Sequence, residues 1–240
     1  MTKKFDENAR QNLLSQKKLF NPLLCEADAK PNQMVVKKVP ASSVREYIAS
    51  FHYSHIMPDN AFECYAGYYG DSLAGVVVFG NGASNEAFKA LIPFIEVTNC
   101  RELMRLWSPD GMPANTESKL ISESIKLLPK EVYLILSFAD PNQNHKGIIY
   151  QACNFHYCGM SNPSKMLIDD KGCIFHVRTI GSFKRRHPEL RSMTHKEIMA
   201  KYNWKYIDAS GKHRYVLFRG EKWLQKLMYY RIQHHIEEYP

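Results

Sequence analysis

An apolar run over residues 132–138, with Ser137 as its one polar member, is the clearest hydrophobic pattern in the chain. Only a strand that is covered on both faces buries every side chain of such a run, so the pattern predicts a central and largely parallel strand. The run ends at Ala139, Asp140 and Pro141, and apolar residues at helical spacing then predict a helix within residues 145–154. Asp140 is therefore expected at the carboxyl end of a buried strand, where open α/β sheets bind their ligands.

The other patterns predict alternating strands and helices. Residues 33–39 alternate as a short strand, and a helix that starts near Val44, with Ser42 or Ser43 as its cap, follows them. Residues 62–79 predict a hairpin with its turn at residues 70–72. Further elements are expected at residues 7–20 (helix), 87–92 (helix), 96–107 (strand), 115–128 (helix), 155–178 (antiparallel strands), 193–202 (helix), 213–218 (strand) and 221–239 (helix). This order predicts a mixed α/β fold with a right-handed β-α-β unit and two parallel central strands.

The expected strand at residues 96–107 contains two arginines. Under strict alternation Arg101 and Arg105 share one face with Leu103 and Trp107, so the two guanidinium groups point the same way. Such a pair is costly in a sheet unless an anion or a carboxylate answers it. Asp140 is the candidate carboxylate.

The composition is typical of a globular protein. Hydrophobic residues make up 45% and aromatic residues 12% of the 240 residues, and no run of about 18 apolar residues occurs, so we expect a cytoplasmic protein without a membrane span. The six cysteines are scattered without repeated C-x2-C pairs, which predicts reduced thiols rather than a zinc ribbon or a disulfide scaffold. Cys153, His156 and Cys158 lie close in sequence but on different expected elements, so we expect a structural role for them.

The positive charge is concentrated towards the C-terminus. Residues 178–240 hold 14 Lys and Arg against 6 Asp and Glu, a balance equal to the net charge of +8 of the whole chain. Aromatic residues are interleaved with these cations, which is typical of surfaces that bind phosphates and bases. A basic solvated surface is the alternative. The cations expected to bind a nucleic acid or another polyanion are Lys184, Arg185, Arg186, Lys212 and Arg214.

Five motifs between about residue 50 and residue 218 are similar, in order, to motifs of the Mom family of phage adenine-modification proteins: FHYSH, RELMRLW, SFADP, GIIYQACNFHYCG and KHRYVLF. The resemblance implies a GNAT N-acyltransferase-like fold. In that fold the fourth and fifth strands of a central mixed sheet splay apart and helices flank the sheet, here with a basic C-terminal extension. The resemblance also implies an enzyme that converts adenine in duplex DNA to an N6-carbamoylmethyl form and so protects phage DNA from restriction endonucleases.

The resemblance further implies that the catalytic residues are Asp140, Tyr150, Arg105, His52 and Tyr53, with Arg105 favoured over Arg101. Asp140 would accept a hydrogen bond or a proton from the exocyclic amine. Arg105 would hold a donor anion or a developing oxyanion, and Tyr150 would protonate the leaving group.

Substrate binding is expected from Arg101, Trp107 and Ser108. Because the amine of a paired adenine lies inside the duplex, we expect base flipping, with Tyr53 or Trp107 stacking on the extruded ring.

The donor is left open between acetyl-coenzyme A and a glycine-bearing donor such as glycyl-tRNA. The Q/R-x-x-G-x-G/A turn with which GNAT enzymes hold the pyrophosphate of coenzyme A is absent, and SPDGMPANTES in its place offers fewer free amides. A helix N-terminus at Asn115 remains as an anion site. Iron is associated with the family, and His52, His55 and Asp140 would give it two histidines and one carboxylate, with Tyr53 as an alternative ligand.

Three regions are expected: an N-terminal segment of unassigned role at residues 1–32, a GNAT-like catalytic core at 33–180, and a basic, aromatic-rich part at 181–240 that completes the fold and contacts DNA. The expected partners are double-stranded DNA and an acyl or aminoacyl donor in the host cytoplasm, and a homodimer is left open. Two other functions also remain open: a GNAT acetyltransferase acting on a small amine or a protein, and a non-enzymatic DNA-binding protein.

Overall fold

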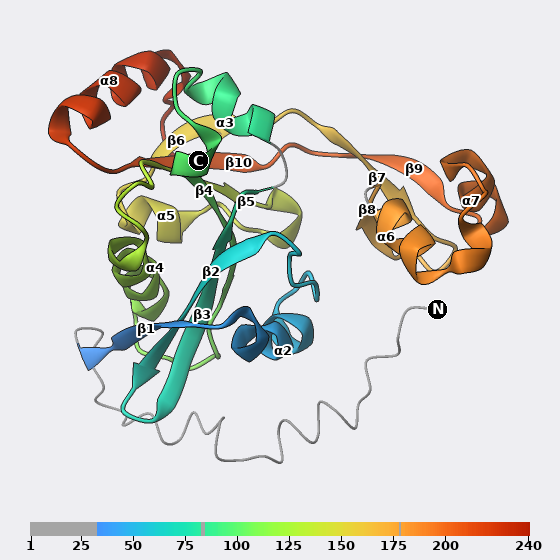
Figure 1. The fold of residues 1–240 in the computed structure, drawn as a ribbon, viewed down its shortest axis with the longest axis horizontal. Coiled ribbons are helices and arrows are strands. Elements are labelled where there is room, and N and C mark those ends of the chain that lie inside the picture. Colours follow the sequence, from blue (N-terminus) through green and yellow to red (C-terminus); the bar gives the residue numbers. More distant parts are fainter. Residues whose placement is uncertain (1–32, 83–84, 178) are drawn as a thin grey trace. The chain divides into compact units, whose positions relative to one another are not determined.

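The computed structural model describes residues 33–82, 85–177 and 179–240, which form two compact units. The first unit contains residues 33–139, Gly147–Gly159 and Arg214–Pro240, and the second contains Asp140–Lys146 and Met160–His213. Figure 1 traces the elements of both units along the chain. The helix expected at residues 7–20 lies outside the described residues.

The first unit is built on a mixed sheet, which confirms the expected fold class. Among the described residues it has seven strands in the order β1-β2-β3-β4-β5-β10-β6 (Figure 1). They are β1 (Val35–Val39), β2 (Ala61–Tyr69), β3 (Ser72–Gly80), β4 (Cys100–Trp107), β5 (Leu134–Ala139), β6 (His156–Met160) and β10 (His213–Phe218). The expected hairpin is confirmed as β2 and β3, and β4 and β5 pair in parallel as predicted.

Helices cover both faces of this sheet. They are α2 (Ala41–Phe51), α3 (Asn85–Leu91), α4 (Thr116–Leu127), α5 (Ile148–Ala152) and α8 (Lys222–Ile232). Phe79 of β3 packs in one cluster with Leu120 of α4, whereas Val78 packs in another with Ile48 of α2. Figure 1 shows α4 and α2 on opposite sides of the strands. The apolar run of β3 thus has no polar face because each face is covered by a helix.

Several expected boundaries are wrong, among them the end of the last helix, since α8 ends at Ile232 and not at residue 239. Helix α2 begins at Ala41, with Pro40 as its N-cap and no side-chain cap, rather than at a serine cap near Val44. The fixed φ of proline, here −65°, suits the entry into a helix and allows this early start. Strand β4 begins only at Cys100, because Val97–Asn99 form a 3₁₀-helix.

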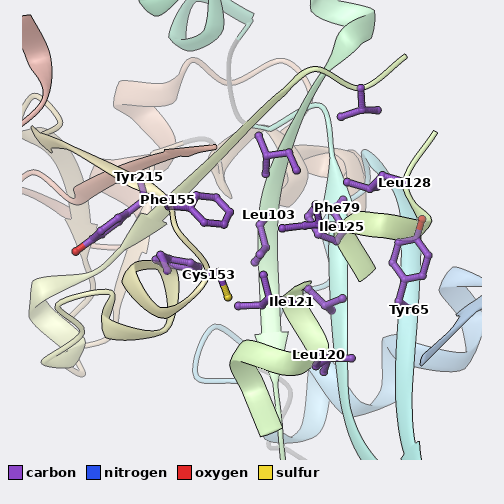
Figure 2. Close-up of a cluster of buried hydrophobic side chains, with 14 of the residues drawn as sticks. Tyr65, Phe79, Leu103, Leu120, Ile121, Ile125, Leu128, Cys153, Phe155 and Tyr215 are labelled. Carbon is purple, nitrogen blue, oxygen red and sulfur yellow. The ribbon is translucent and has the colours of Figure 1, made fainter. Parts of the chain in front are cut away.

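The core next to β5 contains several aromatic rings. Phe155 and Tyr215 are fully buried, and Figure 2 shows them in the same cluster as Leu103 of β4 and Ile121 of α4. The rings of Tyr215 and Tyr150 have centroids 5.2 Å apart. These contacts fix α5, the short helix on which Tyr150 lies.

Gly147, the residue before α5, allows the chain to approach this core closely. Its φ is +79°, and a Cβ at this position would collide with the ring of Tyr215. Only glycine combines this backbone conformation with such a close approach. Gly147 therefore helps to place Tyr150 three residues later.

The second unit has its own sheet and its own core. Within the described residues its sheet has the order β8-β7-β9, and its pairs are antiparallel, as predicted for β7 and β8. The elements of this unit are β7 (Ser164–Ile168), β8 (Ile174–His176), α6 (Thr179–Arg186), α7 (His195–Lys201) and β9 (Lys205–Ala209). Its buried apolar residues are Leu167, Ile180, Leu190 and Ile198. The basic stretch expected at residues 181–240 is therefore shared between the two units, because β10 and α8 belong to the first.

Two further predictions concern the cysteines, expected as reduced thiols, and membrane-spanning helices, of which none was expected. The five cysteines among the described residues are free, and Cys25 lies outside that range. None of the helices in the described ranges is long and apolar enough to cross a membrane.

Replacing Leu120, which is fully buried on α4, tests the core between α4 and the sheet. Leu120→Ala is expected to lower the free energy of unfolding by about 2–5 kcal/mol, because a cavity is left in a packed core. Leu127→Ala, on the same helix but 49% exposed, is the control and is expected to cost less than about 1 kcal/mol. Urea denaturation measures both changes. Equal losses in the two variants would contradict the assigned packing.

Candidate functional site

The candidate site is organised by an irregularity in β4. Leu103 pairs with Phe79 of β3, and Arg105 pairs with Val78, so Met104 is an extra residue on its strand. Such a β-bulge interrupts the alternation of side chains between the two faces. The parallel pairing of β4 with β5 also ends at Leu103 and Ser137, although β4 continues to Trp107.

The bulge separates the two arginines. Leu103 and Leu106 both pack in the cluster under α4, three residues apart, whereas Trp107 packs in the cluster under α2. Arg101 therefore shares the face of Leu103, and Arg105 shares the face of Trp107. The prediction that both guanidinium groups lie on one face is wrong, because it assumed an unbroken strand.

Arg101 forms an ion pair with Glu63 of β2. Its Nε donates to Oε2 of Glu63 at 2.9 Å and its Nη2 donates to Oε1 at 3.2 Å, and the two side chains are 13% and 6% exposed. The ring of Phe62 lies 5.7 Å from the guanidinium carbon. The carboxylate that answers Arg101 is thus Glu63 and not Asp140, and the pair joins β4 to the hairpin.

Arg105 lies near the loop that follows α2. Its Nε donates to the carbonyl of Ile56 at 3.1 Å, and its Nη1 donates to the carbonyl of Met104 at 2.6 Å. Burial lowers the pKa of Arg105, and the nearby groups Tyr53 and Glu102 oppose that effect. Arg105 is therefore a largely desolvated cation with two acidic groups in its neighbourhood.

Tyr150 is a buried phenol in the same unit. Burial raises its pKa to about 12, a hydrogen bond with Ser137 acts against this, and Tyr53 and Glu102 raise the value further. Tyr53 and Glu102 thus affect the pKa of both Arg105 and Tyr150, and by this electrostatic coupling alone we group the four residues as the Arg105 cluster. Tyr150 itself packs in the core under α4, whereas Arg105 lies on the face of β4 towards α2. A phenol with this pKa stays protonated at neutral pH, so it can act as a proton donor.

The two histidines after α2 differ in their surroundings. His52 is buried, its Nδ1 lies 2.8 Å from Oγ of Ser54, and its ring centroid lies 4.3 Å from that of Tyr53. His55 has a positive φ of 50°, and its Nδ1 lies 3.0 Å from the carbonyl oxygen of Ala49. His52 supports Tyr53, whose side chain is 46% exposed.

The predicted metal site is not found. In the part of the chain that the structure describes, no group of three or more His, Cys, Asp and Glu side chains could hold a metal ion. His52 and His55 belong to the first unit and Asp140 to the second, so the set of these three residues as iron ligands stays a prediction. The histidine nitrogens that face polar atoms have Ser54 and Ala49 as neighbours instead.

Asp140 belongs to the second unit. Its Oδ1 accepts hydrogen bonds from the backbone and side-chain nitrogens of Asn142, both at 3.0 Å, and its Oδ2 lies 3.0 Å from Nζ of Lys212. Burial acts to raise the pKa of Asp140, but the bond and charge of Lys212 and the bonds from Asn142 outweigh it, so the pKa lies below its ordinary value. Asp140 is thus an ionised hydrogen-bond acceptor and a weak base.

Trp107 and Ser108 make structural contacts. The ring of Trp107 stacks on Tyr47 and Phe51 of α2, with centroids 5.8 Å and 5.2 Å away. Ser108 donates from Oγ to the carbonyl of Ala74 at 2.7 Å. Both side chains attach the end of β4 to its neighbours.

The expected DNA-binding cations lie in both units. Lys184, Arg185 and Arg186 end helix α6, and Nζ of Lys184 donates to the carbonyl of Met193 at 2.7 Å. Lys212 is the partner of Asp140, and Arg214 of the first unit donates to the carbonyl of Cys158. Lys184, Lys212 and Arg214 therefore also stabilise the fold locally.

Glu102 and Gly82 were not predicted as site residues. Glu102 is partly buried on β4, and its carboxylate fills the space that a Cβ on Gly82 would need. Gly82 has a φ of +73°, and its carbonyl accepts a hydrogen bond from Asn60. The available signal was an acidic residue in a strand whose other charged residues are two arginines.

Comparisons with known proteins agree on a family. The model of the Mom protein family matches residues 33–240. The methylcarbamoylase mom of Escherichia phage Mu is 26% identical over 233 residues, which cover 91% of this chain and 92% of that protein.

Solved structures that match are acetyltransferases. The IAA acetyltransferase from Bacillus cereus has a TM-score of 0.42 and 11% identity over 78% of this chain and 99% of its own. A Bacillus subtilis acetyltransferase in complex with CoA has a TM-score of 0.40 and 14% identity over 78% of this chain and 99% of its own. A variant of the SpeG spermidine N-acetyltransferase from Vibrio cholerae has a TM-score of 0.43 and 11% identity over 78% of this chain and 94% of its own.

The ion pair of Arg101 and Glu63 can be tested by removing the charge of one partner. Glu63→Gln is expected to lower the free energy of unfolding by about 3–5 kcal/mol, because a poorly solvated guanidinium loses its counter-ion. Glu123→Gln is the control, since Glu123 pairs with Lys119 and Lys126 at the surface of α4 and such pairs contribute less than about 1 kcal/mol. Thermal and urea unfolding measure both, and similar small effects would show that the buried pair is not structural.

Proposed function

This chain belongs to the Mom protein family, and we propose that it is a transferase that modifies adenine at N6 in double-stranded DNA. The observation that carries the proposal is the match to the methylcarbamoylase of phage Mu along almost the full length of both chains. The modification is a methylcarbamoylation or a related acyl-type transfer. It protects the DNA of a phage from restriction endonucleases, because those enzymes read the unmodified base edge.

The proposed reaction requires proton transfer both at the adenine amine and at the leaving group of the donor. The lone pair of N6 is delocalised into the purine ring, so the amine must lose a proton while the leaving group gains one. Tyr150 donates the proton that the leaving group gains, since its raised pKa keeps the phenol protonated until then. Arg105 stabilises the negative charge that develops on the donor, and its desolvation strengthens that interaction.

Base flipping brings the amine out of the duplex. Tyr53 is the aromatic residue that stacks on the extruded adenine, because nearly half of its side chain is exposed while Trp107 already stacks on two rings of α2. His52 holds the ring of Tyr53 from the buried side. Asp140 accepts a hydrogen bond from the exocyclic amine, a role that suits an ionised carboxylate.

The donor delivers an activated two-carbon unit. In acetyl-coenzyme A and in a glycine ester such as glycyl-tRNA the carbonyl carbon bears a good leaving group. Acetyl-coenzyme A would leave an N6-acetyl group, whereas the glycine ester also supplies the nitrogen that a carbamoylmethyl group contains. Each fits the roles of Arg105 and Tyr150, because thiolate and alkoxide leaving groups both gain from protonation.

The second unit contributes most of the charge that attracts DNA. Its residues, 140–146 and 160–213, contain 12 Lys and Arg against 6 Asp and Glu, so +6 of the net charge of +8 lies there. Lys184, Arg185 and Arg186 form a run of three cations at the C-terminal end of α6. This unit is the proposed grip on the phosphate backbone.

Mass spectrometry of nucleosides from DNA of cells that express the chain tests the function. A modified adenosine with an added N6 substituent is expected with the wild-type protein, and Asp140→Ala is expected to abolish it while duplex binding stays near the wild-type level. Asp170→Ala, an exposed carboxylate in the turn before β8, is the control and should leave the product unchanged. Unmodified DNA with the wild-type protein, or acetylation of small amines alone, would contradict the proposal.

Charge reversal of Lys184, Arg185 and Arg186 tests the grip on DNA. The triple variant is expected to bind all duplex sequences more weakly and to reduce the slope of log K against log salt by roughly 3, at about 0.9 per lost phosphate contact. Lys126→Glu, on α4 and 67% exposed, is the control. Titrations at several salt concentrations measure both slopes, and an unchanged slope in the triple variant would place the DNA elsewhere.

A further inference from the structure

Helix α8, the red helix in Figure 1, exposes an apolar face that none of the roles above uses. Trp223, Leu227 and Tyr230 are 66%, 46% and 70% exposed, and their spacings of four and three residues place them on one face of the helix. Met228 and Ile232 lie on the opposite face, where they are fully buried and pack with residues of β5 and β10. We call the three exposed side chains the α8 stripe.

The α8 stripe is a contiguous apolar surface rather than a set of scattered side chains. Residues three and four apart are neighbours on the surface of a helix, so each member of the stripe lies next to another. Single exposed apolar residues are ordinary in proteins, but contiguous patches with large aromatic rings mark binding surfaces. The helix is already attached to the sheet by its buried face, so the fold does not require rings on the outer one. The stripe is therefore suited to a partner.

The charges next to the stripe are positive. Lys226 lies on the same face at helical spacing, and Lys222 and Arg231 lie in the first and last turns of the helix; all three are exposed. The helix itself contains no acidic residue. Glu237, the next carboxylate along the chain, lies against Gly159 of β6. The partner that fits this surface has negative charge beside flat groups that aromatic rings can contact.

A second copy of the chain fits this surface poorly. In a two-fold symmetric contact, residues at the centre of the shared patch meet their own copies near the axis. Lys226 lies near the centre of the stripe, so the two ammonium groups would come together. No carboxylate on the helix would compensate for this repulsion.

Unpaired nucleic acid has both of the required properties. Its phosphates attract the cations of α8, and its bases offer flat faces to the indole and the phenol, whereas the bases of a duplex are covered by their neighbours. Trp223 and Tyr230 are separated by about 10 Å along the helix axis, which is roughly three times the base spacing of about 3.4 Å. A short segment of unpaired strand can therefore contact both rings.

We propose that the α8 stripe binds unpaired bases of the DNA substrate, an assignment that rests on the proposed function for the choice of DNA. An enzyme that turns a base out of a duplex acts on DNA whose stacking is disturbed, and the rings of α8 stack on bases that have lost a neighbour. The cations at the end of α6 belong to the second unit and offer charge without such rings. The chain thus has one surface that binds phosphates and another that also binds bases.

Trp223→Leu and Tyr230→Leu test the stripe, because each removes a ring at an exposed position and keeps an apolar side chain. The ligand is single-stranded oligothymidylate, which contains no adenine and so does not occupy the site of the reaction. Each variant is expected to bind it roughly 5- to 100-fold more weakly, the effect of one lost stack between a base and a ring. Phe94→Leu removes a ring that is 50% exposed between α3 and β4 and is the matched control, expected to bind as wild type. Fluorescence anisotropy measures the affinities, and melting temperatures close to wild type show that the variants are folded.

Stacking on Trp223 has a spectroscopic signature as well. Oligothymidylate is expected to quench part of the tryptophan fluorescence of the wild-type protein, and this part should be missing in Trp223→Leu. A duplex of the same length should quench less, because its bases are already stacked. The triple charge reversal at the end of α6 should keep the quenching at saturating oligonucleotide, since it leaves the rings in place.

Wild-type affinity in both ring variants, or equal quenching by the duplex, overturns the assignment while the proposed function stands. Tighter binding of oligouridylate than of oligothymidylate would assign the surface to RNA, and a halved mass of Trp223→Leu in sedimentation would assign it to a second copy; either result also overturns the proposal. If the ring variants lose oligothymidylate but DNA of cells with the wild-type protein contains no modified adenine, the proposed function fails and the single-stranded DNA surface stands.

Discussion

The extra residue in β4 is the constraint on which the candidate site depends. With Met104 inserted opposite the pair Val78 and Phe79, the strand presents Leu103 and Leu106 to one face and Arg105 and Trp107 to the other. The parallel ladder with β5 pairs Arg101 and Glu102 and ends at Leu103, so Arg105 lies on the part of β4 that is no longer paired with β5. In a regular strand Arg101 and Arg105 would lie on the same face, and Glu102 would lie on the face opposite Arg105.

Each of the two arginines near the bulge has a counter-charge or hydrogen-bond acceptors beside it. Arg101 has Glu63, and Arg105 has two backbone carbonyls with Tyr53 and Glu102 nearby. An uncompensated guanidinium in a sheet covered on both faces would cost several kcal/mol, so these partners are required by the fold as well as by any chemistry. The desolvation that makes them necessary also strengthens the field that acts on Tyr150.

The division into two units separates most of the proposed catalytic residues, with the exception of Asp140, from most of the positive charge. The buried phenol and the Arg105 cluster belong to the first unit, which is nearly neutral, whereas the second unit has most of the positive charge and a core of its own. Residues 160–213, the larger part of the second unit, form an insertion in the chain between β6 and β10. These two strands are neighbours in the sheet of the first unit. Because both ends of the insertion lie on adjacent strands, the sheet can form around it without a break in its order.

The sequence by itself determined the mixed sheet, the hairpin, the parallel pair of β4 and β5 and the family, because these depend on local apolar patterns and ordered motifs. It also singled out Tyr150 and Arg105, whose catalytic roles stay predictions: Tyr150 packs in the core under α4, and Arg105 lies on the face of β4 towards α2. Only the tertiary structure decided the faces of β4, since a one-residue bulge leaves no mark on the apolar pattern yet moves every later side chain to the other face. The pairing of Arg101 with Glu63, and the position of Glu102 against Gly82, likewise depend on strands and loops that are distant in sequence, and spacing along a chain cannot encode such contacts.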